Sequence, residues 1–290
     1  MAQITAALVK QLREMTSVGM MECKKALVEA DGDIDKAVDI LRTHGLAAAA
    51  KKAGRATNEG TVIVKVNDDH TVGAILELNC ETDFVGTNEV FLGYADRICT
   101  AVLENDAADV DALKKCSLDG ETVEDILNDA IHKLGENMQI ARFKKVESDG
   151  YIASYIHMGG KIGIIVDYAI GNKATGDNPE FIQFSKDVAM QVAAMNPVSV
   201  SRDTVPDDVK AHEMEIYKAQ AAESGKPENI QEKIATGRME KFYKENCLLE
   251  EAFVKDNDKT VGQLMGEVAK AVGDTIDVNS FVRFVLGEAE

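Results

Sequence analysis

The feature that most constrains the fold is a strand hairpin that occurs twice in the chain. At residue 60 the apolar periodicity changes to two, and residues 61–66 and 72–78 are apolar-rich runs on either side of a polar turn, a pattern typical of two paired β-strands. The pattern returns 90 residues later (162 − 72 = 90), where residues 151–156 and 162–168 flank a Gly-Gly turn. Because residues 72–78 match residues 162–168 position by position, we expect two similar small sheets.

A second self-match, at an offset of 138 residues (260 − 122 = 138), closes each half of this repeat. Residues 122–135 match residues 260–273 as an apolar helical pattern that ends in glycine, and a strand pattern follows each of them. Each half also carries a helix pattern in between, at residues 89–103 and 180–195. The plan strand, strand, helix, helix, strand predicts an α+β fold with two small antiparallel sheets, each covered by helices on one face.

The second half must hold an insertion, because the two offsets differ by 48 residues (138 − 90 = 48). Residues 206–250 are charged and helical in pattern, and Ser224-Gly225-Lys226-Pro227 interrupts them near the middle. We expect an antiparallel helical hairpin that projects from the second sheet domain, because such a polar segment cannot form a core.

The N-terminal segment predicts a separate helical bundle. Between residues 4 and 53, apolar residues recur at helical spacing in three short runs, and Asp31 and Asp33 are candidate caps for the third. Residues 47–54, rich in alanine and lysine, are typical of a helical linker. The expected domains are therefore a helical domain with its linker, two core subdomains and the inserted hairpin, at residues 1–54, 55–148, 149–205 with 251–290, and 206–250.

Charge and cysteine content exclude several classes of protein. The net charge of −18 disfavours binding to nucleic acid and to anionic membranes. Met1 to Lys10 lacks the pattern of a secretory signal, and no stretch is apolar enough to cross a membrane, so we expect a cytoplasmic protein. The five cysteines are far apart and lack metal-ligand spacing, which predicts reduced, mostly buried thiols and no metal site.

Motifs of the common enzyme classes are absent from the sequence. It contains no glycine-rich phosphate loop, no HExxH and no GxSxG. The best enzymatic arrangement combines Cys80, Asp83 and His157, which lie near hairpin ends and would allow a Cys-His nucleophile pair. That hypothesis, a thiol hydrolase, requires an exposed and essential Cys80.

The segment Asn79-Cys80-Glu81-Thr82-Asp83-Phe84-Val85, directly after a strand, carries more information. Asp and Thr favour a local turn, which places Phe84 at its tip. The residues by themselves favour Phe84 folding inward as a core anchor, with Asp83 capping the next helix. In the alternative, Phe84 points outward into a pocket on a partner, where a buried aromatic supplies much of the binding energy.

At this point the sequence resembles the bacterial elongation factor Ts family. Two strings carry the resemblance, Leu12-Arg13-Glu14-Met15-Thr16-Ser17-Val18-Gly19-Met20-Met21-Glu22-Cys23-Lys24-Lys25-Ala26-Leu27 and Glu77-Leu78-Asn79-Cys80-Glu81-Thr82-Asp83-Phe84-Val85. The resemblance covers nearly the whole chain. It implies a ubiquitin-associated (UBA)-like N-terminal bundle, a two-part core and an antiparallel coiled-coil hairpin, in a protein that is not an enzyme and needs no cofactor.

The resemblance also implies a partner and a mode of contact. The partner is elongation factor Tu, a GTPase, from which this family promotes the release of GDP, in a 1:1 or a 2:2 complex. The resemblance reverses the expectation for Phe84, which becomes a wedge between helices of the GTPase, while Asp83 helps to displace the elements that hold Mg²⁺. The full set of implied contact residues is the loop Thr82, Asp83, Phe84 and Val85, the core residue His157, and the bundle residues Arg13, Met20 and Met21.

Two alternatives stay open at this stage besides the thiol hydrolase. For Met20 and Met21, packing in the core of the bundle competes with partner contact. For the whole protein, a non-enzymatic adaptor that uses its UBA-like bundle as a docking module competes with the exchange factor.

Overall fold

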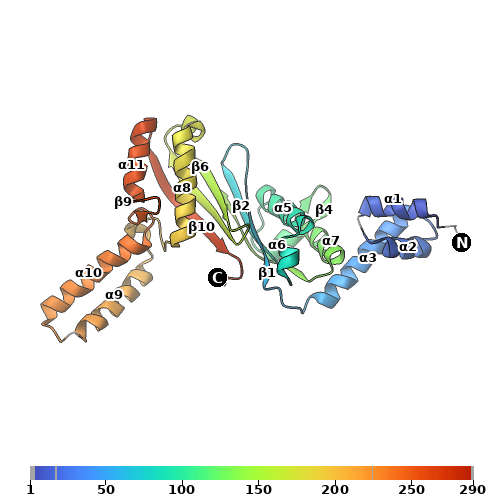
Figure 1. Ribbon diagram of the computed structural model, residues 1–290, viewed down its shortest axis with the longest axis horizontal. Helices are drawn as coiled ribbons and strands as arrows, with labels where there is room; N and C mark the ends of the chain where they lie inside the picture. Colours follow the sequence, from blue (N-terminus) through green and yellow to red (C-terminus); the bar gives the residue numbers. More distant parts are fainter. Residues whose placement is uncertain (1–3, 17, 224, 289–290) are drawn as a thin grey trace. The chain divides into compact units, whose positions relative to one another are not determined.

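The computed structural model describes residues 4–16, 18–223 and 225–288, and its chain forms two compact units (Figure 1). The first unit comprises residues 1–63, 76–144 and 286–290, and the second comprises residues 64–75 and 145–285. The hairpin of the first half is therefore shared, because its base belongs to the first unit and its tip to the second.

Three helices form the N-terminal bundle of the first unit, α1 (Ala6–Thr16), α2 (Met20–Glu29) and α3 (Ile34–Lys52). Their core contains Leu12, Cys23 and Leu27, which are fully buried. Asp33 caps α3 by accepting a hydrogen bond from the backbone N–H of Lys36 (3.1 Å), which decides between the two candidate caps. Helix α3 continues to Lys52, so most of the predicted helical linker forms its last turns.

The rest of the first unit is a three-stranded sheet with helices. The strands lie in the order β1-β2-β5, with β1 (Glu59–Val66), β2 (Val72–Cys80) and β5 (Met138–Glu147). The elements between β2 and β5 are α4 (Asp83–Gly86), α5 (Glu89–Glu104), α6 (Val110–Lys115), the strand pair β3 (Ser117–Leu118) and β4 (Glu121–Thr122), and α7 (Val123–Leu134). Helix α5 buries Phe91, Ala95 and Ile98, the spacing of one helix face.

The second unit repeats this arrangement. Its sheet has the order β10-β7-β6 and is antiparallel, with β6 (Tyr151–His157), β7 (Ile162–Ile170) and β10 (Ile276–Val285). Helices α8 (Pro179–Met195) and α11 (Val261–Val272) lie over one face of the sheet, where Tyr168 and Phe181 are fully buried (Figure 1). The short elements are η1 (Lys173–Asp177), η2 (Arg202–Thr204), β8 (Ala252–Phe253) and β9 (Asp256–Thr260).

The tip of the β1–β2 hairpin packs within this second unit. His70 stacks on Tyr151 with ring centroids 4.3 Å apart, and its carbonyl oxygen accepts a hydrogen bond from the backbone N–H of Ile152 (2.7 Å). A Cβ on Gly73 would lie 3.0 Å from a methyl carbon of Ile152, so the absent side chain permits this close packing.

The predicted duplication is confirmed down to the helix ends. Thr122 and Thr260 begin α7 and α11 with reciprocal capping boxes, and Gly135 and Gly273 end them in the left-handed conformation at φ 78° and 72°. The α+β prediction with two small antiparallel sheets is therefore confirmed.

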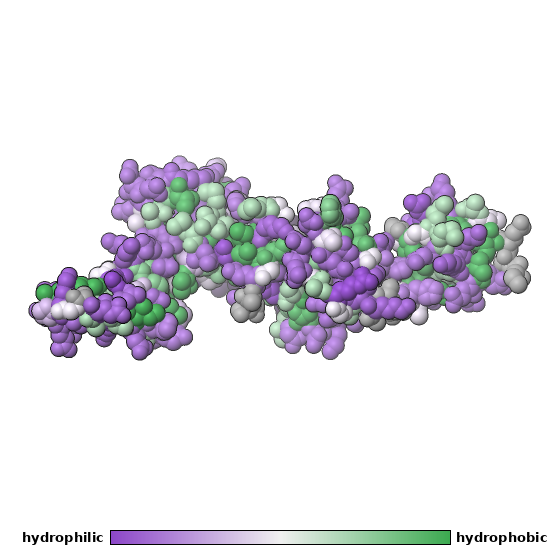
Figure 2. Space-filling view, turned by 60° about the horizontal axis from the view of Figure 1, so that its bottom comes forward, coloured by the Kyte–Doolittle hydropathy of each residue, from purple (hydrophilic) through white to green (hydrophobic). Residues whose placement is uncertain are grey.

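The inserted segment forms two helices that pack side by side, α9 (Asp207–Ala222) and α10 (Glu228–Asn246) (Figure 1). Helix α9 ends at Ala222 and α10 begins at Glu228, so the break falls where the sequence predicts it, with Gly225 at φ 62°. Ser224 of the predicted break lies outside the described residues. Met239 and Phe242 of α10 are buried, in one apolar cluster with Val205, which precedes α9. Hydrophilic residues cover much of the surface that Figure 2 displays. Among the described residues, no helix has the length and the apolar composition that crossing a bilayer requires.

Candidate partner-binding site

The turn that follows β2 presents Phe84 to solvent. The side chain of Phe84 is 83 per cent exposed, the largest exposed fraction among the large hydrophobic side chains that the structure describes. The inward position that the residues alone favour is therefore wrong. Asp83 does not cap the next helix either, because Asn88 caps α5 by accepting a hydrogen bond from the backbone N–H of Val90 (2.8 Å).

The geometry of α4 explains why Phe84 points outward. Thr82 caps this short helix by accepting a hydrogen bond from the backbone N–H of Val85 (3.4 Å). Gly86, its buried residue, faces β1 so closely that an added Cβ would lie 3.2 Å from the carbonyl oxygen of Gly60. Two residues along a helix correspond to a rotation of roughly 200°, so Phe84 lies on the side opposite Gly86.

Two carboxylates hold the start of this turn. Glu136 accepts hydrogen bonds from the backbone N–H groups of Glu81 (3.1 Å) and Thr82 (3.0 Å), and from the Thr82 hydroxyl (2.6 Å). In return, Glu81 accepts one from the backbone N–H of Asn137 (2.6 Å), which lowers the pKa of the Glu81 carboxyl together with the nearby Arg55. The Thr82 hydroxyl is thus used within the chain, both as donor and as acceptor.

Sequence reasoning missed Glu136 as a site residue. The signal was present in the repeat, since Gly135-Glu136 matches Gly273-Asp274, but the match by itself does not show what the carboxylate contacts. That contact joins residues 54 positions apart.

His157, the predicted core residue, ends β6 in the second unit. It is half-buried, and its Nδ1 lies 3.0 Å from the hydroxyl of Tyr155. The neighbouring Ile156 and Met158 are exposed apolar side chains, with Met158 71 per cent exposed at φ 50°. Sequence reasoning also missed Ile156 and Met158. Strand alternation predicts which face of the sheet a side chain lies on, but it does not predict whether another element covers that face.

The predicted residues of the bundle lie on its surface. Arg13 is exposed on α1, and Met20 and Met21 at the start of α2 are 53 and 66 per cent exposed. The core-packing alternative for these methionines is therefore wrong. Met15 and Val28 are exposed apolar residues of the same bundle that sequence reasoning did not single out.

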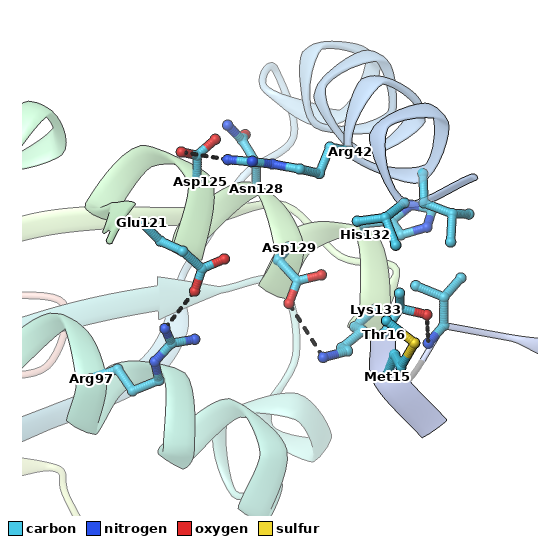
Figure 3. Close-up of a pocket in the computed structure, with 14 residues that line it drawn as sticks. Met15, Thr16, Arg42, Arg97, Glu121, Asp125, Asn128, Asp129, His132 and Lys133 are labelled. Atoms are coloured by element: carbon cyan, nitrogen blue, oxygen red, sulfur yellow. Dashed lines mark hydrogen bonds and ion pairs between the residues drawn. The ribbon is translucent and has the colours of Figure 1, made fainter. Parts of the chain in front are cut away.

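A cavity of about 310 Å³ in the first unit has a charged lining, but its charges are paired (Figure 3). Arg42 lies 2.9 Å from Asp125, and Arg97 lies 2.7 Å from Glu121. Lys133 similarly contacts Asp129 (3.2 Å). This arrangement joins neighbouring helices and presents no nucleophile with a base.

The thiol hydrolase hypothesis is contradicted by the position of Cys80. Its side chain is fully buried, and its Sγ donates to the carbonyl oxygen of Thr82 (3.2 Å), so it is not an exposed nucleophile. Cys23, Cys99 and Cys247 are buried as well, which confirms the prediction of mostly buried thiols. Within the described ranges, no group of three or more His, Cys, Asp or Glu residues is arranged to hold a metal ion.

Comparison with known proteins decides the family. A family model described as "Elongation factor TS" matches residues 81–288. The match includes residues 81–87 after β2, which carry Phe84 and are called the Phe84 turn below. Elongation factor Ts of Clostridioides difficile strain 630 is 49% identical over 289 residues, covering 99% of this chain and 94% of that protein. The chain belongs to the elongation factor Ts family.

Other family members show similar agreement. Elongation factor Ts of Clostridium botulinum strain Alaska E43 and of Clostridium perfringens strain SM101 are each 48% identical, covering 98% of this chain and 93% of the relative. Because these alignments span the N-terminal bundle as well as the core, the family resemblance inferred from two sequence strings is confirmed for nearly the whole chain.

Proposed function

We propose that this chain binds elongation factor Tu in its GDP form and promotes GDP release, so that GTP can bind during translation elongation. The observation that carries the proposal is the exposure of Phe84 on a turn whose backbone is held by hydrogen bonds. A large aromatic side chain that is 83 per cent exposed contributes little to the stability of its own fold. Buried in a partner, the same side chain contributes much of the binding energy.

Phe84 and Asp83 have different roles in this proposal. Phe84 enters between helices of the GTPase and separates them. Asp83, exposed beside it, helps to displace the elements that hold Mg²⁺. Loss of Mg²⁺ weakens GDP binding, because the ion neutralises phosphate charge and joins the phosphates to the protein.

The exchange itself requires only a difference in binding. A protein that binds the nucleotide-free GTPase more tightly than the GDP complex must lower the affinity for GDP by the same factor. No covalent bond is made or broken in this scheme, so the proposed factor is not an enzyme in the chemical sense and uses no cofactor.

Two further surfaces complete the proposed interface. Arg13, Met20 and Met21 on the bundle supply a mixed cationic and apolar contact, and their exposure supports this assignment. His157 supplies a core contact, with the exposed Ile156 and Met158 beside it. Val85, half-buried at the end of the turn, contributes through its partly exposed side chain.

The finer architecture forms part of the proposal. We assign residues 1–54 to a UBA-like domain, residues 55–148 and 149–205 with 251–290 to the two core subdomains, and residues 206–250 to an antiparallel coiled-coil hairpin. The packing of α9 against α10 and the small apolar core of α1 to α3 support these assignments. The proposed location is the cytoplasm, with a 1:1 or 2:2 complex with the GTPase.

Stopped-flow release of fluorescent GDP from elongation factor Tu tests the proposal. We expect the native chain to accelerate release many-fold and Phe84→Ala to lose roughly 30- to 100-fold of that effect, as is usual for a central aromatic contact. Ile230→Ala, which truncates another exposed apolar residue on α10, is the control and should stay within about twofold. Thermal unfolding of Phe84→Ala should match that of the native chain, because Phe84 is exposed.

The adaptor remains the second candidate, because the exposed Met15, Met20, Met21 and Val28 would suit a docking bundle. If the native chain binds elongation factor Tu but leaves the rate of GDP release unchanged, the exchange proposal is wrong and the adaptor is favoured.

A further inference from the structure

The carboxylate of Glu136 holds the Phe84 turn at its first residues. One carboxylate accepts three hydrogen bonds, two from consecutive backbone N–H groups and one from the Thr82 hydroxyl, at 2.6 to 3.1 Å. The same hydroxyl accepts the capping hydrogen bond of α4. The orientation of α4 is therefore connected to α7, whose last turn is followed by Gly135 and Glu136.

The second half of the chain repeats this arrangement. Asp274, which is 138 residues after Glu136, accepts hydrogen bonds from the backbone N–H of Asn172 (2.8 Å) and from the Thr175 hydroxyl (2.6 Å). Asn172, which is 90 residues after Thr82, caps η1 by accepting a hydrogen bond from the backbone N–H of Ala174 (3.0 Å). In both halves, the central strand of the sheet is followed by a short helix whose capping residue, Thr82 or Asn172, donates its backbone N–H to a carboxylate. That carboxylate, Glu136 or Asp274, directly follows a glycine in the left-handed conformation.

The two turns differ in what they present. Residues 173–177, Lys-Ala-Thr-Gly-Asp, contain no aromatic side chain, whereas α4 carries the exposed Phe84. Because Phe84 is largely in solvent, packing of its own side chain contributes little to its direction. Its direction follows from the backbone of α4, and that backbone is held by Thr82 and Glu136.

We propose that Glu136 is a positioning residue for nucleotide exchange, which orders the Phe84 turn before the partner binds. This inference rests on the proposed role of Phe84. A turn that is already ordered loses less conformational entropy on binding, which increases affinity without any contact between Glu136 and the partner. Charge-assisted hydrogen bonds to two backbone N–H groups are strong enough for this purpose.

The amide variant isolates the need for two acceptor atoms. In Glu136→Gln, one carbonyl oxygen remains while the NH₂ group can only donate, so either the backbone pair or the Thr82 hydroxyl loses its acceptor. Glu136→Ala removes all three hydrogen bonds. We expect exchange to fall about tenfold in Glu136→Ala and less in Glu136→Gln, with amide hydrogen exchange of residues 82–87 faster in the same order.

A double-mutant cycle with Phe84→Ala tests whether Glu136 acts through Phe84. GDP release from elongation factor Tu is measured for the native chain, both single variants and the double variant. If Glu136 positions Phe84, then Glu136→Ala lowers the rate about tenfold in the native background and less than about twofold in the Phe84→Ala background. Equal losses in both backgrounds would show that Glu136 acts elsewhere and would overturn the inference.

Asp274→Ala is the matched control that the duplication offers. It removes the equivalent carboxylate from a turn without an aromatic residue, so it should destabilise the second unit while exchange stays within about twofold. If Asp274→Ala lowers exchange as much as Glu136→Ala, the effect reflects general loosening and the inference is wrong. If the native chain accelerates GDP release but Phe84→Ala leaves that rate unchanged, the proposed role of Phe84 fails instead. If the native chain itself leaves the rate unchanged, the proposed function fails, and the same data set separates these outcomes.

Discussion

The turns after β2 and β7 are held by the same arrangement of hydrogen bonds but present different side chains. In each, a carboxylate from the segment after a helix accepts a backbone N–H and a threonine hydroxyl. Only the first turn carries an exposed aromatic residue. The difference teaches that this hydrogen-bonded arrangement is part of the duplicated scaffold, whereas the proposed partner contact is an addition to one copy.

The helices that precede these carboxylates differ in their surroundings. Helix α7 buries Ile126, Leu127 and Ile131, and α3 packs against it within the first unit. In α11, the matching Leu264, Met265 and Ala269 are only partly buried. The N-terminal bundle therefore supplies cover that the second copy of the fold does without.

The largest expected effect comes from two glycines that the repeat places at matching positions, Gly60 and Gly150 (150 − 60 = 90). A Cβ on Gly60 would overlap the carbonyl oxygen of Leu78, and one on Gly150 would overlap that of Tyr168. Because backbone atoms cannot move aside as a flexible side chain does, each Gly→Ala substitution should destabilise by about 3 kcal/mol or more.

Hydrogen exchange resolved by region measures where these two variants act. Gly60→Ala should loosen the β1–β2–β5 sheet and Gly150→Ala the β6–β7–β10 sheet. Gly93→Ala on α5, where an added Cβ meets nothing within 4 Å, serves as the harmless control. If the sheet amides of both variants are as well protected from hydrogen exchange as those of the native chain, these glycines do not constrain the repeat.

A pH effect of intermediate size should distinguish the two halves. Glu251 and Cys116 occupy matching positions, since their carbonyl oxygens accept hydrogen bonds from the backbone N–H groups of Val261 and Val123. Glu251 is buried, Gln191 donates to one of its oxygens (3.0 Å), and its other oxygen has no hydrogen-bond partner in the described structure. Burial raises the pKa of the Glu251 carboxyl to about 7.

The sign follows from proton binding. The folded state binds the Glu251 proton more tightly than the unfolded state, so this stabilisation is full below pH 4.5 and is lost as the pH rises through about 7. Between pH 5 and pH 8, the free energy of unfolding of the native chain should fall by on the order of 2 kcal/mol, a decrease that Glu251→Gln should not show. Urea unfolding across this pH range measures it, and an identical slope in the variant would exclude a neutral Glu251.

The smallest effects concern the paired capping boxes. Thr122→Ala and Thr260→Ala should each cost about 1 kcal/mol, because each removes the acceptor for a backbone N–H at 3.1 or 3.2 Å. Thr122→Ala should lower the free energy of unfolding slightly more, because Asp125 of its capping box also forms an ion pair with Arg42 on α3 (2.9 Å). Thermal unfolding compares the pair, and the matching Thr→Ser variants should restore most of the loss.

Much of the fold follows from local patterns that a sequence displays directly. The two hairpins, the closing helix, glycine and strand, and the inserted helical pair were all predictable, because apolar periodicity and turn residues act over a few positions. The candidate residues Phe84, His157, Arg13, Met20 and Met21 came from the resemblance to the elongation factor Ts family, and their contacts with a partner stay a prediction.

The direction of Phe84, the exposure of the bundle methionines and the contacts of Glu136 depended on tertiary structure. Each depends on residues far away in the chain: Gly60 faces Gly86, and Glu136 reaches Thr82 across 54 positions. Sequence by itself determined which elements form and that they form twice. Only tertiary packing decided which side chains remain in solvent, because exposure depends on what a distant element covers.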